Sequence, residues 1–195
     1  GNYSERELDE WAARIERWRR RVDVFVLQQR LGGLRGAKRP GFGNPARSGN
    51  GVGVTDALLL VDVLKDFHHE DGDALLESYR RRHAALVALL EDARASGLPV
   101  VYANDRGGHT EPADVVRAAV EEGKAGQLVA EIAPLDGEPV VLKDAYSAFD
   151  ATGLQDVLAG LEAERLLLAG AATEMCVFQT ALDAQTRASA CASRW

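Results

Sequence analysis

The chain of 195 residues has little of what marks disulfide-rich, membrane-spanning or nucleic-acid-binding proteins. Its two cysteines, Cys176 and Cys191, cannot form a disulfide framework, so we expect a reducing, cytoplasmic environment. No apolar run approaches the roughly 20 residues of a membrane-spanning helix, and the N-terminus has no signal-peptide pattern. The 23 basic residues are outnumbered by 30 acidic ones, whereas nucleic-acid binding usually needs a basic face. We therefore expect a protein that binds neither membranes nor nucleic acids.

Residues 1–31 predict an amphipathic helix. Ser4 and Glu7 have the spacing of a capping box. Apolar residues then recur at steps of three and four and form one stripe, namely Leu8, Trp11, Ile15, Trp18, Val22 and Phe25. This helix could pack on its own domain, mediate dimerisation or partner binding, or lie on a membrane surface, although the net charge of −7 opposes anionic lipid. We expect a homo-oligomer.

Residues 32–53 predict a flexible linker or surface arm. They hold eight glycines and two prolines, too many for a helix or an interior strand. The glycines at 49–53 do not predict a phosphate-binding loop, because they precede the first strand and no Lys-Ser/Thr pair follows them.

Residues 54–195 predict an α/β domain. Ala57–Val61 is an unbroken apolar run, which is typical of a strand covered on both faces. Strands and helices then alternate, which indicates a three-layer α/β/α fold with a mostly parallel open sheet. Asp73 is expected to cap the first helix and Gly97 to end it. The expected strands are 57–61, 99–104, 139–143 and 165–169, and the expected helices are 73–96, 112–122, 153–161 and 173–187.

Polar residues follow the ends of the predicted strands. Asp62 ends the first strand, Asn104 and Asp105 the second and Lys143 the third, and the fourth leads to Cys176 at the start of a helix. Ligands of open parallel sheets bind at the carboxyl ends of the strands. An acid, a base and a thiol are therefore expected to meet at one edge of the sheet.

These three groups suit nucleophilic catalysis. The first turn of a helix and the ammonium of Lys143 would both favour the thiolate form of Cys176. Asp62 could take the thiol proton and deliver it to a leaving group, while backbone N–H groups at Ala172 and Cys176 could hold an oxyanion. Each residue also has an ordinary structural interpretation, as a turn former, a solvated charge or a packed thiol.

Three segments of the domain carry distinctive motifs. Residues 57–67 are a strand followed by Asp-x-x-x-Asp-Phe, residues 140–149 are a strand ending in Lys and followed by Ser-Ala-Phe, and residues 168–177 contain Gly-x-Ala-Thr-Glu-x-Cys-Val. Together they resemble the isochorismatase-like cysteine hydrolase superfamily, which includes nicotinamidases and carbamoylsarcosine amidohydrolases. The resemblance covers residues 54–187.

The resemblance implies a catalytic triad and a reaction. Asp62 would be the general acid and base, Lys143 the cation that supports the thiolate, and Cys176 the nucleophile. The family's cis peptide would fall at Ala171–Ala172. The implied reaction is hydrolysis of a small amide or carbamoyl compound through a Cys thioester.

Two stretches depart from the family pattern. Nicotinamidases have an Asp-x-His metal motif after the second strand, but His109 lies four residues beyond Asp105, so we expect no catalytic metal and no cofactor. After the Cys helix, Thr186–Ser189 leads directly to Ala190–Trp195 where the family has a further strand and helix. The last strand and helix are therefore expected to be absent, which would expose an edge of the sheet.

The substrate itself cannot be identified from the sequence. Phe67, Asn104, Tyr146 and Phe149 flank the strand ends and are expected to line the substrate pocket, with core packing as the alternative. Two other functions stay open. One is an inactive hydrolase fold that acts in binding or assembly through its N-terminal helix, and the other is a thiol redox protein based on Cys176.

Overall fold

A parallel sheet of four strands organises the described part of the chain. The structure, a computed structural model, describes residues 56–163 and 165–192, with side chains up to residue 186. The sheet order is β3-β2-β1-β4, and every neighbouring pair of strands is parallel. This arrangement confirms the predicted open parallel sheet. The strands are β1 (Asp56–Val61), β2 (Val100–Asp105), β3 (Val140–Lys143) and β4 (Arg165–Gly170).

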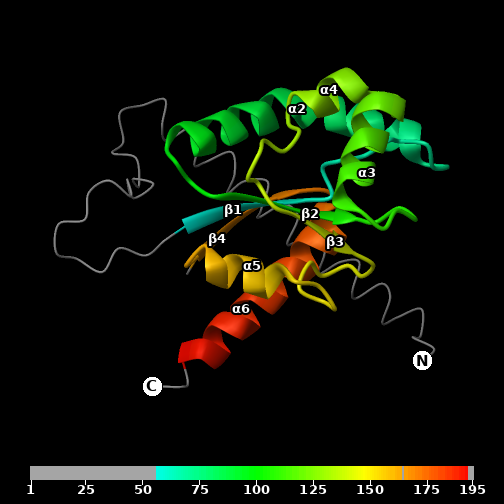
Figure 1. The fold of residues 1–195 in the computed structure, drawn as a ribbon. Coiled ribbons are helices and arrows are strands. Elements are labelled where there is room, and N and C mark those ends of the chain that lie inside the picture. The colour runs from blue at the N-terminus through cyan, green and yellow to red at the C-terminus, as the bar shows by residue number, and fades with distance from the viewer. Residues whose placement is uncertain (1–55, 164, 193–195) are drawn as a thin grey trace, which may run out of the picture. The chain divides into compact units, whose positions relative to one another are not determined.

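Helices cover both faces of this sheet (Figure 1). One face carries α2 (Gly72–Ala95), α3 (Pro112–Arg117), the π-helical turn η1 (Ala118–Glu122) and α4 (Gly126–Ala130). The other face carries α5 (Leu154–Gly160), the π-helical turn η2 (Thr173–Val177) and α6 (Phe178–Ala192). The predicted three layers are therefore confirmed. Within residues 56–163 and 165–192, no helix has the length and apolar character needed to cross a membrane.

The central strand β1 contributes side chains to two hydrophobic cores, one on each face of the sheet. All six of its residues are buried, as expected for an apolar run between two helical layers. Because side chains alternate along a strand, Leu58 and Leu60 pack in the core beneath α2, α3 and α4. Ala57, Leu59 and Val61 pack in the opposite core with α5 and η2. β1 therefore fixes the position of Asp62, which follows it directly.

The structure corrects several predicted boundaries. The helix predicted for 112–122 is α3 followed by η1, and α4 was not predicted. Asp71, not Asp73, is the N-cap residue of α2, and Asp73 accepts a hydrogen bond from Lys124 at 2.7 Å. Gly97 does follow the end of α2, in the left-handed conformation with φ 71°.

The end of the domain also differs in detail from the prediction. The helix expected to end at Arg187 continues to Ala192 as α6, and in the part of the chain described here no strand follows it. β4 is consequently one edge of the described sheet. The helix predicted for residues 1–31 and the arm predicted for 32–53 lie outside the described residues.

Candidate active site

Asp62 stands at the carboxyl end of β1 and is held by the neighbouring strand. Its backbone adopts the left-handed conformation, with φ 52°, and its N–H donates to the carbonyl of Ala103 at 2.9 Å. Its Oδ1 accepts a hydrogen bond from the backbone N–H of Asp105 at 2.7 Å and lies 3.9 Å from Lys65 Nζ. With an exposed fraction of 2%, the carboxylate is almost completely removed from water. It needs a charged partner at this depth, because burying an unpaired charge is costly.

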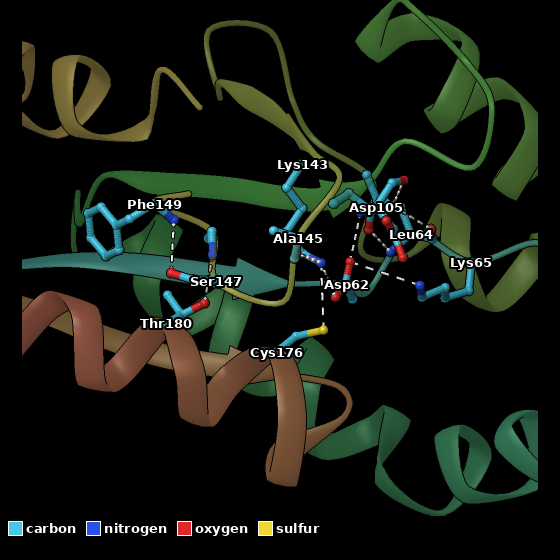
Figure 2. A network of polar contacts seen from close by, with 12 residues as sticks. Asp62, Leu64, Lys65, Asp105, Lys143, Ala145, Ser147, Phe149, Cys176 and Thr180 are labelled. Atoms are coloured by element: carbon cyan, nitrogen blue, oxygen red, sulfur yellow. Dashed lines mark hydrogen bonds and ion pairs between the residues drawn. The ribbon is translucent and has the colours of Figure 1, made fainter. Parts of the chain in front are cut away.

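Lys143 supplies that partner from the end of β3. Its exposed fraction is 1%, and its Nζ lies 2.9 Å from Asp62 Oδ2. The same Nζ donates to the carbonyl of Ala145 at 3.1 Å and to Cys176 Sγ at 3.6 Å, so its three protons have three acceptors (Figure 2). Burial acts to lower the pKa of Lys143, but the hydrogen bond and charge of Asp62 outweigh it and raise the pKa above its usual value. Lys143 is therefore an ammonium at neutral pH.

Cys176 lies in η2, at the start of the helical segment that follows β4, and is half-buried. Burial, together with the hydrogen bond and charge of Asp62, raises the pKa of the thiol to about 11, although Lys143 acts in the opposite direction. Lys143 thus favours the thiolate, as expected, but burial and Asp62 outweigh it. The helix start and Lys143 do not offset desolvation and the nearby carboxylate, so the resting thiol keeps its proton at neutral pH.

The turn between β4 and η2 brings the thiol to the other two groups. The Ala171–Ala172 peptide bond is cis, as the resemblance implies. Gly170 precedes it with φ 148°, and a Cβ at this position would lie 1.9 Å from the carbonyl oxygen of Val61. Only glycine allows β4 to approach β1 so closely. The N–H of Ala171 donates to the same carbonyl at 3.0 Å, which ties the turn to the residue before Asp62.

A cavity of about 570 Å³ opens over the ammonium and the thiol. It lies between the loop after β3 and the helical segment that carries Cys176. Tyr146, with an exposed fraction of 58%, stands at its wall. The cavity is large enough for a small molecule. The lining residues are Asp105, Lys143, Asp144, Ala145, Tyr146, Ser147, Asp150, Cys176, Gln179 and Asp183.

The sequence of the chain is similar to those of known proteins. Residues 56–191, more than half of its length, match the family model described as Isochorismatase domain. The chain belongs to the isochorismatase family. It is 30% identical over 133 residues to the uncharacterized isochorismatase family protein YaaI of Bacillus subtilis (strain 168), a match that covers 67% of this chain and 73% of that relative.

Two further isochorismatase-family relatives have named activities. The maleamate amidohydrolase of Pseudomonas putida is 29% identical over 143 residues, which cover 69% of this chain and 67% of that protein. The crystal structure of N-carbamoylsarcosine amidase from Thermoplasma acidophilum matches with a TM-score of 0.50 and 31% identity, over 69% of this chain and 78% of that one. The family is thus one of hydrolases with amidases among its members.

In this isochorismatase-family chain, only one of the four residues predicted to line the pocket is a lining residue of the described cavity, and that is Tyr146. Phe67 has an exposed fraction of 0% and packs edge to face on Tyr79, with ring centroids 5.3 Å apart. Phe149, at 8%, packs in the core that includes α5. Both rings follow strand ends, but the chain turns them inward, so the alternative of core packing holds for them.

Asn104 also has a different place from the predicted one. Its exposed fraction is 1%, and its Oδ1 accepts from the N–H of Leu64 at 3.0 Å. Its Nδ2 donates to the carbonyls of Leu64 and Asp105, each at 3.0 Å. Asn104 therefore clamps the loop that follows Asp62 onto the end of β2.

Some residues of the site were not predicted from the sequence. Gln179 and Asp183 line the cavity three and seven positions after Cys176, and this helical spacing was a usable signal. Ala145 lines the cavity and accepts from Lys143 through its backbone carbonyl, for which the sequence carries no signal. Within residues 56–163 and 165–186, no group of three or more His, Cys, Asp or Glu side chains could hold a metal ion.

Proposed function

We propose that this isochorismatase-family protein hydrolyses the C–N bond of a small amide or carbamoyl compound through a thioester on Cys176. The observation that carries the proposal is the position of Lys143 Nζ, 2.9 Å from Asp62 Oδ2 and 3.6 Å from Cys176 Sγ, at the base of a cavity of about 570 Å³. The ammonium and the nucleophile thus line one substrate-sized cavity, and the carboxylate of Asp62 is paired with that ammonium. The activities named for two relatives, maleamate amidohydrolase and N-carbamoylsarcosine amidase, support the same reaction class.

In the first half of the proposed reaction, the thiol loses its proton as it attacks. Because the pKa of Cys176 is raised to about 11, a separate thiolate is scarce at neutral pH. Asp62 takes the proton while the sulfur bonds to the carbonyl carbon, and Lys143 stabilises the negative charge that develops on the sulfur. The carbonyl oxygen becomes an oxyanion, for which we propose the backbone N–H groups of Ala172 and Cys176 as donors.

In the second half, the intermediate collapses and water completes the hydrolysis. The C–N bond breaks, and the nitrogen leaves as ammonia or an amine with the proton that Asp62 had taken. Water then attacks the thioester carbonyl while Asp62 accepts a proton from it. The C–S bond breaks, the acid product departs, and the proton returns to the sulfur of Cys176. The free enzyme is restored with no external reductant or oxidant.

The proposal is tested by ammonia release from a panel of small amides, ureido acids and carbamoyl compounds. We expect turnover of at least one member by the wild type and none above background by Cys176→Ala. Asp62→Asn should lower kcat by at least about 100-fold, since general acid–base catalysis contributes that much or more. Cys191→Ser, which removes the second cysteine of the sequence, is the matched control and should keep wild-type activity. Equal turnover by the wild type and Cys176→Ala would overturn the proposal.

A cellular compartment and an oligomeric state are proposed along with the reaction. A free thiol nucleophile is most readily kept reduced in a reducing compartment, and we propose the cytoplasm. We also propose that the protein is a homo-oligomer assembled through the amphipathic helix predicted for residues 1–31. Deletion of these residues should lower the mass measured by light scattering while Cys176 stays reactive toward alkylation. An unchanged mass would refute the role of the helix.

A further inference from the structure

Thr180 is a buried polar residue on the helical segment that carries Cys176. It lies four positions after Cys176 in α6, and its exposed fraction is 0%. Its Oγ1 accepts a hydrogen bond at 2.9 Å from the backbone N–H of Ala148, a residue that is also completely buried. Burying a hydroxyl is costly unless it is hydrogen-bonded, and the bond from Ala148 meets this condition.

The bond is unusual for a threonine inside a helix. Such a hydroxyl commonly donates to a carbonyl one turn earlier in its own helix, as Thr186 does to Leu182 at 3.0 Å. Thr180 instead accepts from a residue 32 positions away, in the loop after β3. It therefore joins two segments of the chain that meet only in the folded protein.

The loop that Thr180 holds is the one that positions Lys143. Two residues after Lys143, the carbonyl of Ala145 accepts from Nζ at 3.1 Å, and three residues further on, Ala148 is bound to Thr180. Between them, Ser147 Oγ accepts from the N–H of Phe149 at 3.2 Å and tightens the turn. Figure 2 shows the side chains of Cys176 and Thr180 directed from the helix toward this loop.

Two contacts join the loop after β3 to the helical segment that carries Cys176. One link is the contact between Lys143 Nζ and Cys176 Sγ at 3.6 Å, and the other is the bond between Ala148 and Thr180. The second link lies away from the reacting atoms and involves no charged group. It can therefore set the geometry of the first link without taking part in the chemistry.

We propose that Thr180 is a positioning residue, which anchors the loop after β3 to the nucleophile helix and so holds the ammonium of Lys143 against the sulfur of Cys176. The inference rests on the proposed function only in treating Cys176 as the nucleophile. Without the hydroxyl, the buried N–H of Ala148 has no acceptor on Thr180, and the loop must shift or admit water to satisfy it. Lys143 then moves from the sulfur, and the thiolate loses its nearest cation.

The test is the pH profile of Cys176 alkylation by iodoacetamide, followed on the Cys176 peptide by mass spectrometry. Thr180→Val keeps the size of the side chain but removes the acceptor. Loss of one nearby opposite charge moves a pKa by about one unit or more, so the rate at about pH 9 should fall roughly tenfold. Thr180→Ser, which keeps the hydroxyl, should restore the wild-type profile. Thr186→Val, the same change on the same helix, should leave the profile unchanged.

The outcomes separate positioning from a merely structural role. A folded Thr180→Val variant with a lower melting temperature but a wild-type alkylation profile would overturn the proposal, as would a Thr180→Ser variant as slow as Thr180→Val. If Thr180→Val does not fold, Thr180→Ala carries the test, because the space it leaves can admit a water to the N–H of Ala148. The assay needs no substrate, so its result is independent of whether ammonia release is ever found.

Discussion

Replacement of Asn104 by leucine tests whether this residue holds the loop after β1 in place or contacts the substrate. The two side chains have the same number and branching of heavy atoms, so Asn104→Leu removes hydrogen bonds without opening a cavity. It deprives Leu64 of both backbone partners, since Asn104 Oδ1 accepts from its N–H and Asn104 Nδ2 donates to its carbonyl, each at 3.0 Å. Leu64 has an exposed fraction of 2%, so water cannot readily replace these bonds.

The expected loss in the free energy of unfolding follows from the unpaired backbone N–H and carbonyl of Leu64. Each buried backbone group left without a partner costs about 1–3 kcal/mol, or roughly 2–6 kcal/mol for the pair. The apolar leucine offsets about 1 kcal/mol of this by burial. A net loss near 3 kcal/mol is a large part of the roughly 5–15 kcal/mol by which a domain is stable. With a urea dependence of about 2 kcal/mol per molar, the unfolding midpoint should fall by about 1.5 M.

The assay is urea unfolding of Asn104→Leu beside Gln179→Leu, followed by circular dichroism. Gln179 is the matched control, since it loses the same amide group but lines the cavity and does not clamp a loop. Its midpoint should stay within about 0.3 M of the wild type, because substitutions away from buried hydrogen-bond networks and similar features cost little. An unchanged midpoint for Asn104→Leu, with only KM for an amide substrate altered, would refute the clamp and restore Asn104 as a substrate contact.

Three further predictions concern the ion pair of Asp62 and Lys143, the turn at Gly170 and the thiol of Cys176. Lys143→Met leaves the Asp62 carboxylate buried without its ammonium and should lower the free energy of unfolding by about 3–5 kcal/mol, measured in urea; a loss below about 1 kcal/mol would contradict the pairing. Gly170→Ala places a Cβ 1.9 Å from a backbone oxygen and should yield little folded protein by circular dichroism, whereas Gly160→Ala, with no atom within 4 Å of its Cβ, should fold normally. Because the pKa of Cys176 is raised to about 11 in the folded chain, that chain binds the thiol proton more tightly than the unfolded chain does, so stability should fall as the pH rises from about 9 to about 11. Melting temperatures across this range should fall less steeply for Cys176→Ala, and an identical slope would count against the shift.

The layered architecture and the end of each strand follow from the order of apolar and polar residues along the chain. The apolar run at 57–61 predicted a strand buried on both faces because its side chains alternate between two cores, and β1 does so. Strand ends could be located to within one residue because local patterns of apolar residues and turn formers fix them. The same reasoning placed Asp62, Lys143 and Cys176 at the carboxyl edge of one sheet, which is where the structure has them.

What each side chain at that edge touches depends instead on how distant segments of the chain pack together. Phe67 and Tyr146 both follow strand ends, yet Phe67 is completely buried in the core beneath α2 and Tyr146 stands at the cavity. Asn104 bonds to a residue 40 positions away, and Thr180 to one 32 positions away. The raised pKa of the Cys176 thiol depends in the same way on burial and on Asp62. For the side chains at this edge, burial, hydrogen-bond partners and the electrostatic field depend on which distant segments pack together, so the local pattern around each residue does not encode them.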